Sequence, residues 1–207
     1  MSSFRSDLAQ EKILAEYLDT IYAKKELDFK RTNDLDLQLQ GIDIIINFNE
    51  KEYLIDEKAQ LHYLNADLPT FTFELSYLKN GILKDGWLFD PSKNTHYYFL
   101  ISGIFLKDDK EELSHADDIK NIKITSVNRN KLIEHLTSIR LDRQSLGQYD
   151  LALREGSSFG SNVINELDGR YGGQMYYTKH LTEQPMNLQL RLSYLIQHGV
   201  AKKFYYQ

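Results

Sequence analysis

Apolar side chains recur at helical spacing near the start of the chain. Leu14, Leu18, Ile21 and Tyr22 fall on one face of a helix, because residues three or four positions apart are neighbours on the helix surface. The pattern predicts an amphipathic helix from Asp7 to Lys25.

The pattern then changes to the alternation that is typical of strands. Three such segments follow, namely Ile42–Phe48, Tyr53–Leu61 and Thr70–Tyr77, and Asn49-Glu50-Lys51 forms a tight connection between the first two. They predict a three-strand β-meander directly after the helix.

The rest of the chain mixes strand and helix signals. The nearly continuous apolar run from His96 to Phe105 predicts a strand that is buried on both faces. Further on, we expect a short strand at Ile122–Val127, a helix capped by Asn128 or Asn130, and a final helix from Leu188 to about Gln197. The expected class is therefore α+β (mixed α/β), with an N-terminal helix and a three-strand meander, then helices and further strands.

Composition narrows the class of protein. The chain has 207 residues, only 3 Pro and no stretch of linker composition, so we expect a single domain over residues 1–207. The absence of Cys excludes disulfides, thiolate zinc sites and a cysteine nucleophile. No apolar run approaches the ~20 residues of a membrane helix, and the N-terminus lacks a signal-peptide core. We expect a cytoplasmic protein without membrane contact.

The net charge of -5 excludes nucleic-acid binding through overall positive charge, although it permits a local basic groove around an acidic metal site. Arg140, Arg143 and Arg154 are candidates for phosphate contacts in such a groove, and ordinary surface charge is the alternative. The six His are scattered along the chain, and no two have the sequence spacing of a ligand pair, so we expect structural or surface roles for them.

The candidate chemistry lies in the first predicted hairpin. Because side chains alternate along a strand, Asp56, Lys58 and Gln60 share one face. An acid, a cation and an amide side by side are not explained by hydrophobic burial. Asp43 lies on the preceding strand and can approach Asp56 across the pair.

Two carboxylates near a lysine suit a hard cation. Mg²⁺ prefers oxygen ligands and keeps several waters, so Asp43 and Asp56 suffice to hold it. Such an ion polarises a phosphate oxygen and lowers the pKa of a bound water. Lys58 is then expected to position or deprotonate that water or to stabilise transition-state charge, and Gln60 to orient the water or contact the substrate backbone.

These residues resemble the PD-(D/E)xK nuclease superfamily, which has the restriction-endonuclease-like fold. Gly41-Ile42-Asp43 matches the first acid, Asp56-Glu57-Lys58 matches the (D/E)xK triplet, and Gln60 matches a glutamine that often follows. The Pro of the family name is replaced by Ile42. The resemblance covers about residues 7–105, and residues 106–207 stay unassigned.

The resemblance implies a metal-dependent nuclease that acts on DNA in preference to RNA, with Mn²⁺ able to replace Mg²⁺. It also implies an additional acid from the first helix, for which Glu11 is favoured over Glu16 because it borders the apolar stripe. Many related enzymes form homodimers to cut both strands, which makes a homodimer an expectation here too.

Two other interpretations stay open. One is a nuclease-fold binding module for nucleic acid or protein that has lost catalysis. The other is an unrelated α+β protein in which the motif is coincidental, and a large separation between Asp43 and Asp56 in space would decide for it.

Overall fold

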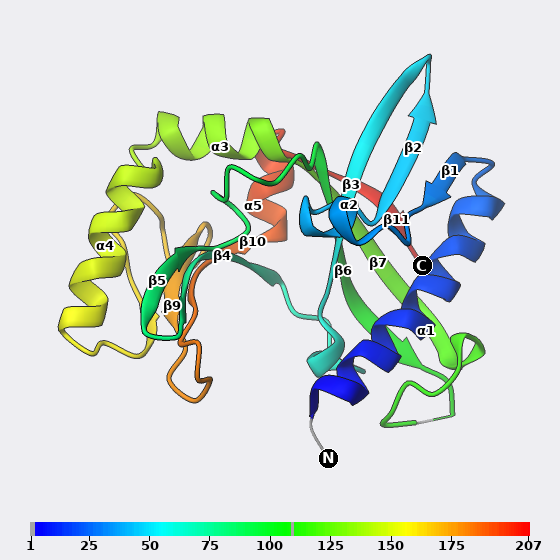
Figure 1. Cartoon of the computed structure of the whole chain (residues 1–207), viewed down its shortest axis with the longest axis horizontal. Helices are drawn as coiled ribbons and strands as arrows, with labels where there is room; N and C mark the ends of the chain where they lie inside the picture. Colours follow the sequence, from blue (N-terminus) through cyan, green and yellow to red (C-terminus); the bar gives the residue numbers. More distant parts are fainter. Residues whose placement is uncertain (1–2, 109) are drawn as a thin grey trace. The chain divides into compact units, whose positions relative to one another are not determined.

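The computed structural model describes residues 3–108 and 110–207, with side chains from residue 8 onward, and Figure 1 shows the order of its elements. Contacts group the chain into two compact units, each built from discontinuous segments. Unit 1 comprises 1–68, 95–127 and 202–207, and unit 2 comprises 69–94 and 128–201. This grouping does not test the prediction of a single domain, which stays a prediction.

Unit 1 contains a six-stranded sheet with the strand order β1-β2-β3-β6-β7-β11. Its strands are β1 (Asp28–Arg31), β2 (Ile44–Phe48), β3 (Lys51–Ala59), β6 (Tyr97–Leu106), β7 (Ile119–Asn128) and β11 (Ala201–Tyr206). Its helices are α1 (Ser3–Lys24) and α2 (Leu35–Leu39), with 3₁₀ turns η1 (Leu61–Tyr63) and η2 (Ala116–Asp118).

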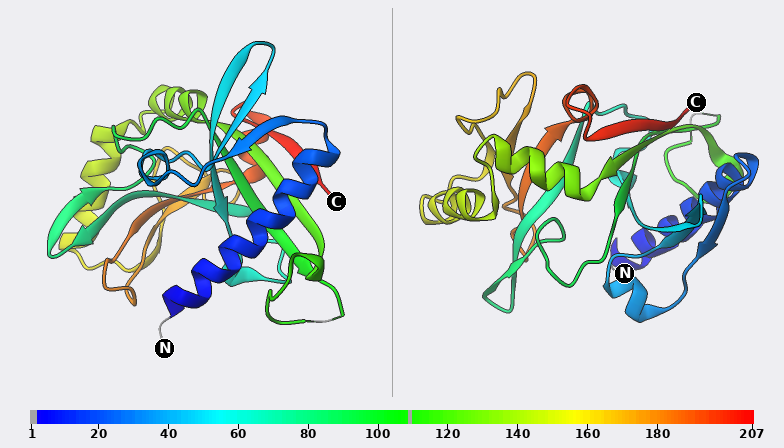
Figure 2. Two further views of the ribbon diagram at one scale, coloured as in Figure 1. Left: turned by 45° about the vertical axis from the view of Figure 1, so that its right-hand side comes forward. Right: turned by 90° about the horizontal axis from the view of Figure 1, so that it is seen from above.

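Helix α1 confirms the first sequence prediction. It crosses one face of the six-stranded sheet (Figure 2), and Leu14, Leu18, Ile21 and Tyr22 are at most 3% exposed in the resulting core. The helix ends where Glu26 adopts a left-handed φ of 56°, which lets the backbone N–H of Leu27 bond back to Tyr22.

The β2–β3 hairpin is confirmed, with a tighter turn than expected. Lys51 pairs with Phe48, so only Asn49 and Glu50 form the loop, and both have positive φ, at 51° and 60°. Two left-handed residues give a turn whose twist matches that of the paired strands. This turn fixes the register that places Ile44 opposite Ile55.

The predicted three-strand meander is wrong. β3 pairs in parallel with β6, whereas β4 (Thr70–Lys79) belongs to a second sheet. The almost wholly buried β6 is suited to an interior position, since parallel strands with both faces covered read as continuous apolar runs. β4 instead buries the alternating Phe71, Phe73 and Leu75 in the core of unit 2.

Unit 2 contains a five-stranded sheet with the strand order β5-β4-β10-β9-β8. Besides β4, its strands are β5 (Ile82–Asp85), β8 (Gly160–Asn162), β9 (Gly173–Tyr177) and β10 (Met186–Arg191). Its helices are α3 (Arg129–Ser138), α4 (Arg143–Glu155) and α5 (Leu192–Gln197). Asn128 caps α3 by accepting from the Lys131 N–H, as one of the two predicted caps.

The predicted final helix is half wrong, because residues 186–191 alternate between buried and half-buried positions and form β10 in the middle of the sheet. Helix α4 has no counterpart in the predictions. Its fully buried positions are Leu146 and the polar Asp150, and the apolar Tyr149 and Leu153 on the same side are only half-buried. The overall class, α+β with two sheets, agrees with the expected one.

No helix among the described residues is both long and apolar enough to cross a membrane.

Two glycines of unit 2 make a matched pair for a stability test. Gly147 lies inside α4 with open space where a Cβ would stand, so Gly147→Ala should raise the free energy of unfolding by about 0.5–1 kcal/mol. At Gly173 in β9, a Cβ would stand 2.3 Å from the Gln189 carbonyl oxygen of β10, so Gly173→Ala should cost about 1–3 kcal/mol. Urea unfolding measures both, and equal effects of the two substitutions would contradict this packing.

Candidate active site

Asp43 stands at the entrance to β2 and is fixed against β3. Its backbone N–H donates to the Ile55 carbonyl at 2.8 Å, which extends the ladder of the hairpin by one residue. Its carboxylate Oδ2 accepts from the Glu57 N–H at 2.7 Å. The side chain is therefore held at the strand pair by the backbone itself.

Asp56 and Lys58 form an ion pair on β3. The Lys58 Nζ lies 2.6 Å from Asp56 Oδ1, and the two side chains are 32% and 2% exposed. Burial raises the pKa of Asp56 to about 7, against the opposing effect of Lys58 and with a further increase from Asp43. The two acids are thus close enough to interact, and the separation that would have indicated a coincidental motif is not observed.

Lys58 is held in its charged form. Burial alone would lower the pKa of the Lys58 ammonium, but the nearby charges of Asp56, Asp43 and Glu11 raise it above its ordinary value. A lysine whose pKa is raised already carries its proton at neutral pH, so its nitrogen cannot accept another from a water. Of the roles expected for Lys58, the electrostatics favour stabilisation of negative charge over deprotonation of a water.

A cavity of about 560 Å³ opens beside these residues within unit 1. Its polar lining comes from α1, from α2, from the segments that adjoin β1 and β2, and from β3, and consists of Glu11, Lys12, Arg31, Thr32, Asn33, Gln38, Asp43, Glu57 and Lys58. Glu11, the favoured acid of the first helix, lines the cavity, whereas Glu16, the other candidate, does not. The buried Asp56 is not among the residues that line the cavity, but it contacts two of them, Lys58 and Asp43.

Gln60 lies beyond the end of β3. The strand stops at Ala59, and Gln60 precedes the 3₁₀ turn η1 with its N–H donated to the Ile101 carbonyl at 3.0 Å. The alternation of a strand therefore does not orient its side chain. Gln60 is also not among the residues that line the cavity.

The three arginines expected at a phosphate-binding patch all lie in unit 2. Arg154 is bound in a network, since its Nε lies 2.6 Å from Asp150 Oδ1 and another of its nitrogens donates to Ser76 at 2.8 Å. Arg143 forms an exposed ion pair with Asp85, and Arg140 is exposed at the end of α3. Their contact with nucleic acid stays a prediction.

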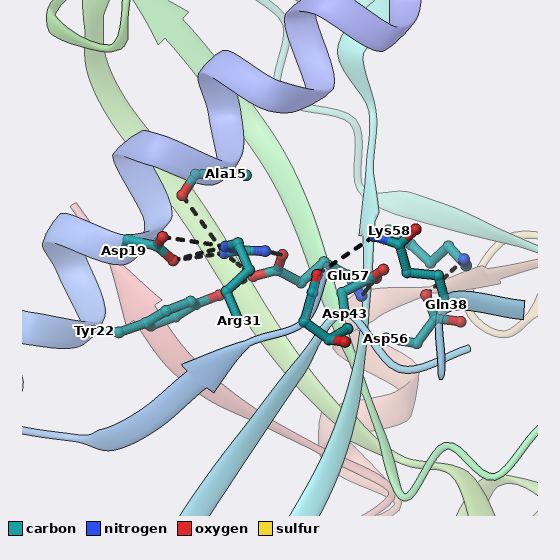
Figure 3. A network of polar contacts seen from close by, with 10 residues as sticks. Ala15, Asp19, Tyr22, Arg31, Gln38, Asp43, Asp56, Glu57 and Lys58 are labelled. Carbon is teal, nitrogen blue, oxygen red and sulfur yellow. Dashed lines mark hydrogen bonds and ion pairs between the residues drawn. The ribbon is translucent and has the colours of Figure 1, made fainter. Parts of the chain in front are cut away.

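The structure adds a network that sequence analysis missed (Figure 3). Arg31 on β1 donates from Nη1 to Glu57 at 2.6 Å and from Nη2 to Asp19 at 2.7 Å. Tyr22 Oη donates to the other oxygen of Glu57 at 2.6 Å. The sequence does indicate that Glu57 has a cationic partner. Strand alternation places Glu57 on the face opposite Asp56, together with the apolar Ile55 and Ala59, and an acid on a buried face needs a cation beside it.

The donor set fits a hard divalent cation. Asp43, just before β2, and Asp56 on β3 supply carboxylate oxygens, and burial, with a smaller contribution from Asp43, raises the pKa of Asp56. Within residues 3–108 and 110–207 no three His, Cys, Asp or Glu side chains converge on one point. Two carboxylates are nevertheless enough for Mg²⁺, which retains waters in its remaining positions.

Comparison of the chain with models of protein families, with curated proteins and with solved structures gives no match.

Arg31→Ala should destabilise the protein by about 3 kcal/mol, because it leaves the Glu57 carboxylate, only 9% exposed, without its cation. Chemical denaturation measures the loss. Lys30→Ala is the matched control, since Lys30 is exposed on the same strand and its removal should change stability by less than about 0.5 kcal/mol. Equal effects of the two substitutions would show that the network does not stabilise the fold.

Mg²⁺ binding should weaken as the pH falls below about 7, where Asp56 holds its proton. A ligand must be deprotonated to bind, so the apparent affinity should fall by up to about tenfold for each pH unit below that point. Calorimetric titration at pH 8, 7 and 6 measures the trend. The Asp56→Asn variant should bind weakly at every pH, and affinity that does not vary with pH in the unmodified protein would exclude Asp56 as a ligand.

Proposed function

We propose that this protein is a metal-dependent nuclease of the PD-(D/E)xK kind, which hydrolyses phosphodiester bonds in DNA in preference to RNA. The observation that carries the proposal is the convergence of Asp43, Asp56 and a charged Lys58 beside a cavity that also contains Glu11. The match of these residues to the superfamily pattern supports the choice of substrate.

Asp43 and Asp56 would hold Mg²⁺, or Mn²⁺ in its place. When bound, the ion supplies Lewis-acid activation of the phosphodiester and of the attacking water. In the overall reaction one water is consumed, one P–O ester bond breaks, and a phosphate monoester and a hydroxyl are formed.

The residues of the chain contribute charge and position. The Lys58 side chain is about one-third exposed and lines the cavity, so its ammonium can face the phosphate, where negative charge develops in the transition state. Glu11 extends the carboxylate surface of the cavity from α1. Arg31 lines the same cavity, but Asp19 and Glu57 already occupy its guanidinium, so it serves to position β3.

A second candidate function has one observation in its favour. Asp56 is 2% exposed and its charge is already paired with Lys58, as expected of a site that is satisfied without a metal. A nuclease-fold binding module for nucleic acid or protein, with catalysis lost, would have this property. A homodimer and a cytoplasmic location stay predictions under both functions.

Cleavage assays on linear, circular, single-stranded and branched DNA and on RNA, with Mg²⁺, Mn²⁺ or EDTA, test the proposal. We expect cleavage that EDTA abolishes and that Lys58→Ala lowers by about 10²–10³-fold, since removing one group that stabilises transition-state charge typically costs this much. Asp56→Asn should abolish it, and Lys30→Ala should cleave as the unmodified protein does.

Cleavage that persists in EDTA, or in both site variants, would overturn the assignment. Binding of DNA without cleavage, in a folded protein that takes up no Mg²⁺, would establish the binding module instead.

A further inference from the structure

Three aromatic side chains of unit 2 gather outside the candidate active site. His135 lies on α3, Tyr194 lies on α5, and His198 directly follows α5. The ring centroids of the two histidines are 4.7 Å apart, and that of Tyr194 lies 4.3 Å from His198 and 5.4 Å from His135. His135 Nε2 and Tyr194 Oη are 2.7 Å apart and share a hydrogen bond.

The arrangement is built by the backbone. Tyr194 and His198 are four residues apart, and the N–H of His198 bonds to the Tyr194 carbonyl at 3.0 Å, so the two side chains project from the same side of one helical turn. His135 is supplied by another helix. The buried Leu132 and Leu136 flank it on α3 and fix that helix in the core, so its position does not depend on the cluster.

The cluster is accessible to an ion from solution. His198 is exposed, and His135 and Tyr194 are half-buried. Burial lowers the pKa of His135, and the neighbouring His198 lowers it further. A lowered pKa favours the neutral imidazole, which is the form that binds a metal ion.

The ligand chemistry differs from that of the carboxylate pair. Imidazole nitrogen suits zinc, copper and nickel, whereas Mg²⁺ requires oxygen. Two imidazoles bind one ion when their nitrogens are roughly 3.3 Å apart, the edge of a tetrahedron with metal–nitrogen bonds of about 2.0–2.1 Å. The ring centroids are 4.7 Å apart and the ring planes are inclined by 34°, so the two imidazoles are near enough for rotation of their side chains to bring one nitrogen of each onto the same ion.

We propose that His135 and His198, with Tyr194 beside them, form a binding site for a borderline divalent transition-metal ion such as Ni²⁺, Cu²⁺ or Zn²⁺. Water fills the positions that the protein leaves open. The site is separate from Asp43 and Asp56 and does not depend on nuclease activity. Sequence spacing missed it because two of its three groups are 63 positions apart and become neighbours only through folding.

The test is calorimetric titration of the full chain at pH 7.5 with Ni²⁺ and then with Cu²⁺. The unmodified protein should bind one ion per chain at this site, Cu²⁺ more tightly than Ni²⁺, following the stability order of divalent metals. Asp56→Asn should retain this binding, which separates it from the carboxylate site.

His198→Ala should weaken binding by at least tenfold, and this exposed position keeps the substitution compatible with folding. His135→Ala should have a similar effect, and Tyr194→Phe a smaller one. His180→Ala is the matched control, since His180 is an exposed histidine outside the cluster, and it should bind as the unmodified protein does.

Absence of Ni²⁺ and Cu²⁺ binding in the folded, unmodified protein would overturn the proposal. Binding that survives His198→Ala without loss would overturn it equally, whatever His135→Ala does to the fold.

Discussion

Burial of two consecutive carboxylates on one strand is the constraint on which unit 1 depends. Asp56 and Glu57 point to opposite faces of β3, so no single cation can neutralise both. Each face supplies its own partner, Lys58 for Asp56 and Arg31 for Glu57. Because a buried charge is costly unless it is paired, β1 and α1 must bring Arg31 and Tyr22 to Glu57, and the Lys58 side chain must reach Asp56.

The two faces of β3 neutralise their carboxylates with different partners. Glu57 receives Arg31 and Tyr22 and forms a closed network with Asp19. Asp56 receives one ammonium and has a second carboxylate, Asp43, beside it, and its pKa remains raised. Burial raises the pKa of both carboxyls, so the two sides differ in their partners: Glu57 has a guanidinium and a phenol, and Asp56 has an ammonium and a second carboxylate.

The sequence predicts what depends on local pattern and misses what depends on pairing between distant segments. Helix α1, the β2–β3 hairpin and the shared face of Asp56 and Lys58 follow from periodicity and are confirmed. The position of β4 does not follow from periodicity, because the alternation of a strand does not specify which sheet the strand joins. The switch from β10 to α5 within residues 186–197 is missed for the same reason, since the spacing of Leu188 and Leu192 is compatible with both periods. The orientation of the Gln60 side chain depends on where β3 ends, and the contact of His135 with His198 depends on the tertiary fold.

The interleaving of the two units has a consequence for how the protein folds during synthesis. β3 is followed by a segment that belongs to unit 2 before its parallel partner β6 appears, and the edge strand β11 comes after β10. The edge strand of the unit 1 sheet and the central strand β10 of the unit 2 sheet are therefore added only when nearly the whole chain has left the ribosome. Pairings between segments so far apart form slowly, because the entropy of loop closure is lost before the contacts are gained. The nascent chain must meanwhile keep the apolar β6 from pairing with the wrong strand.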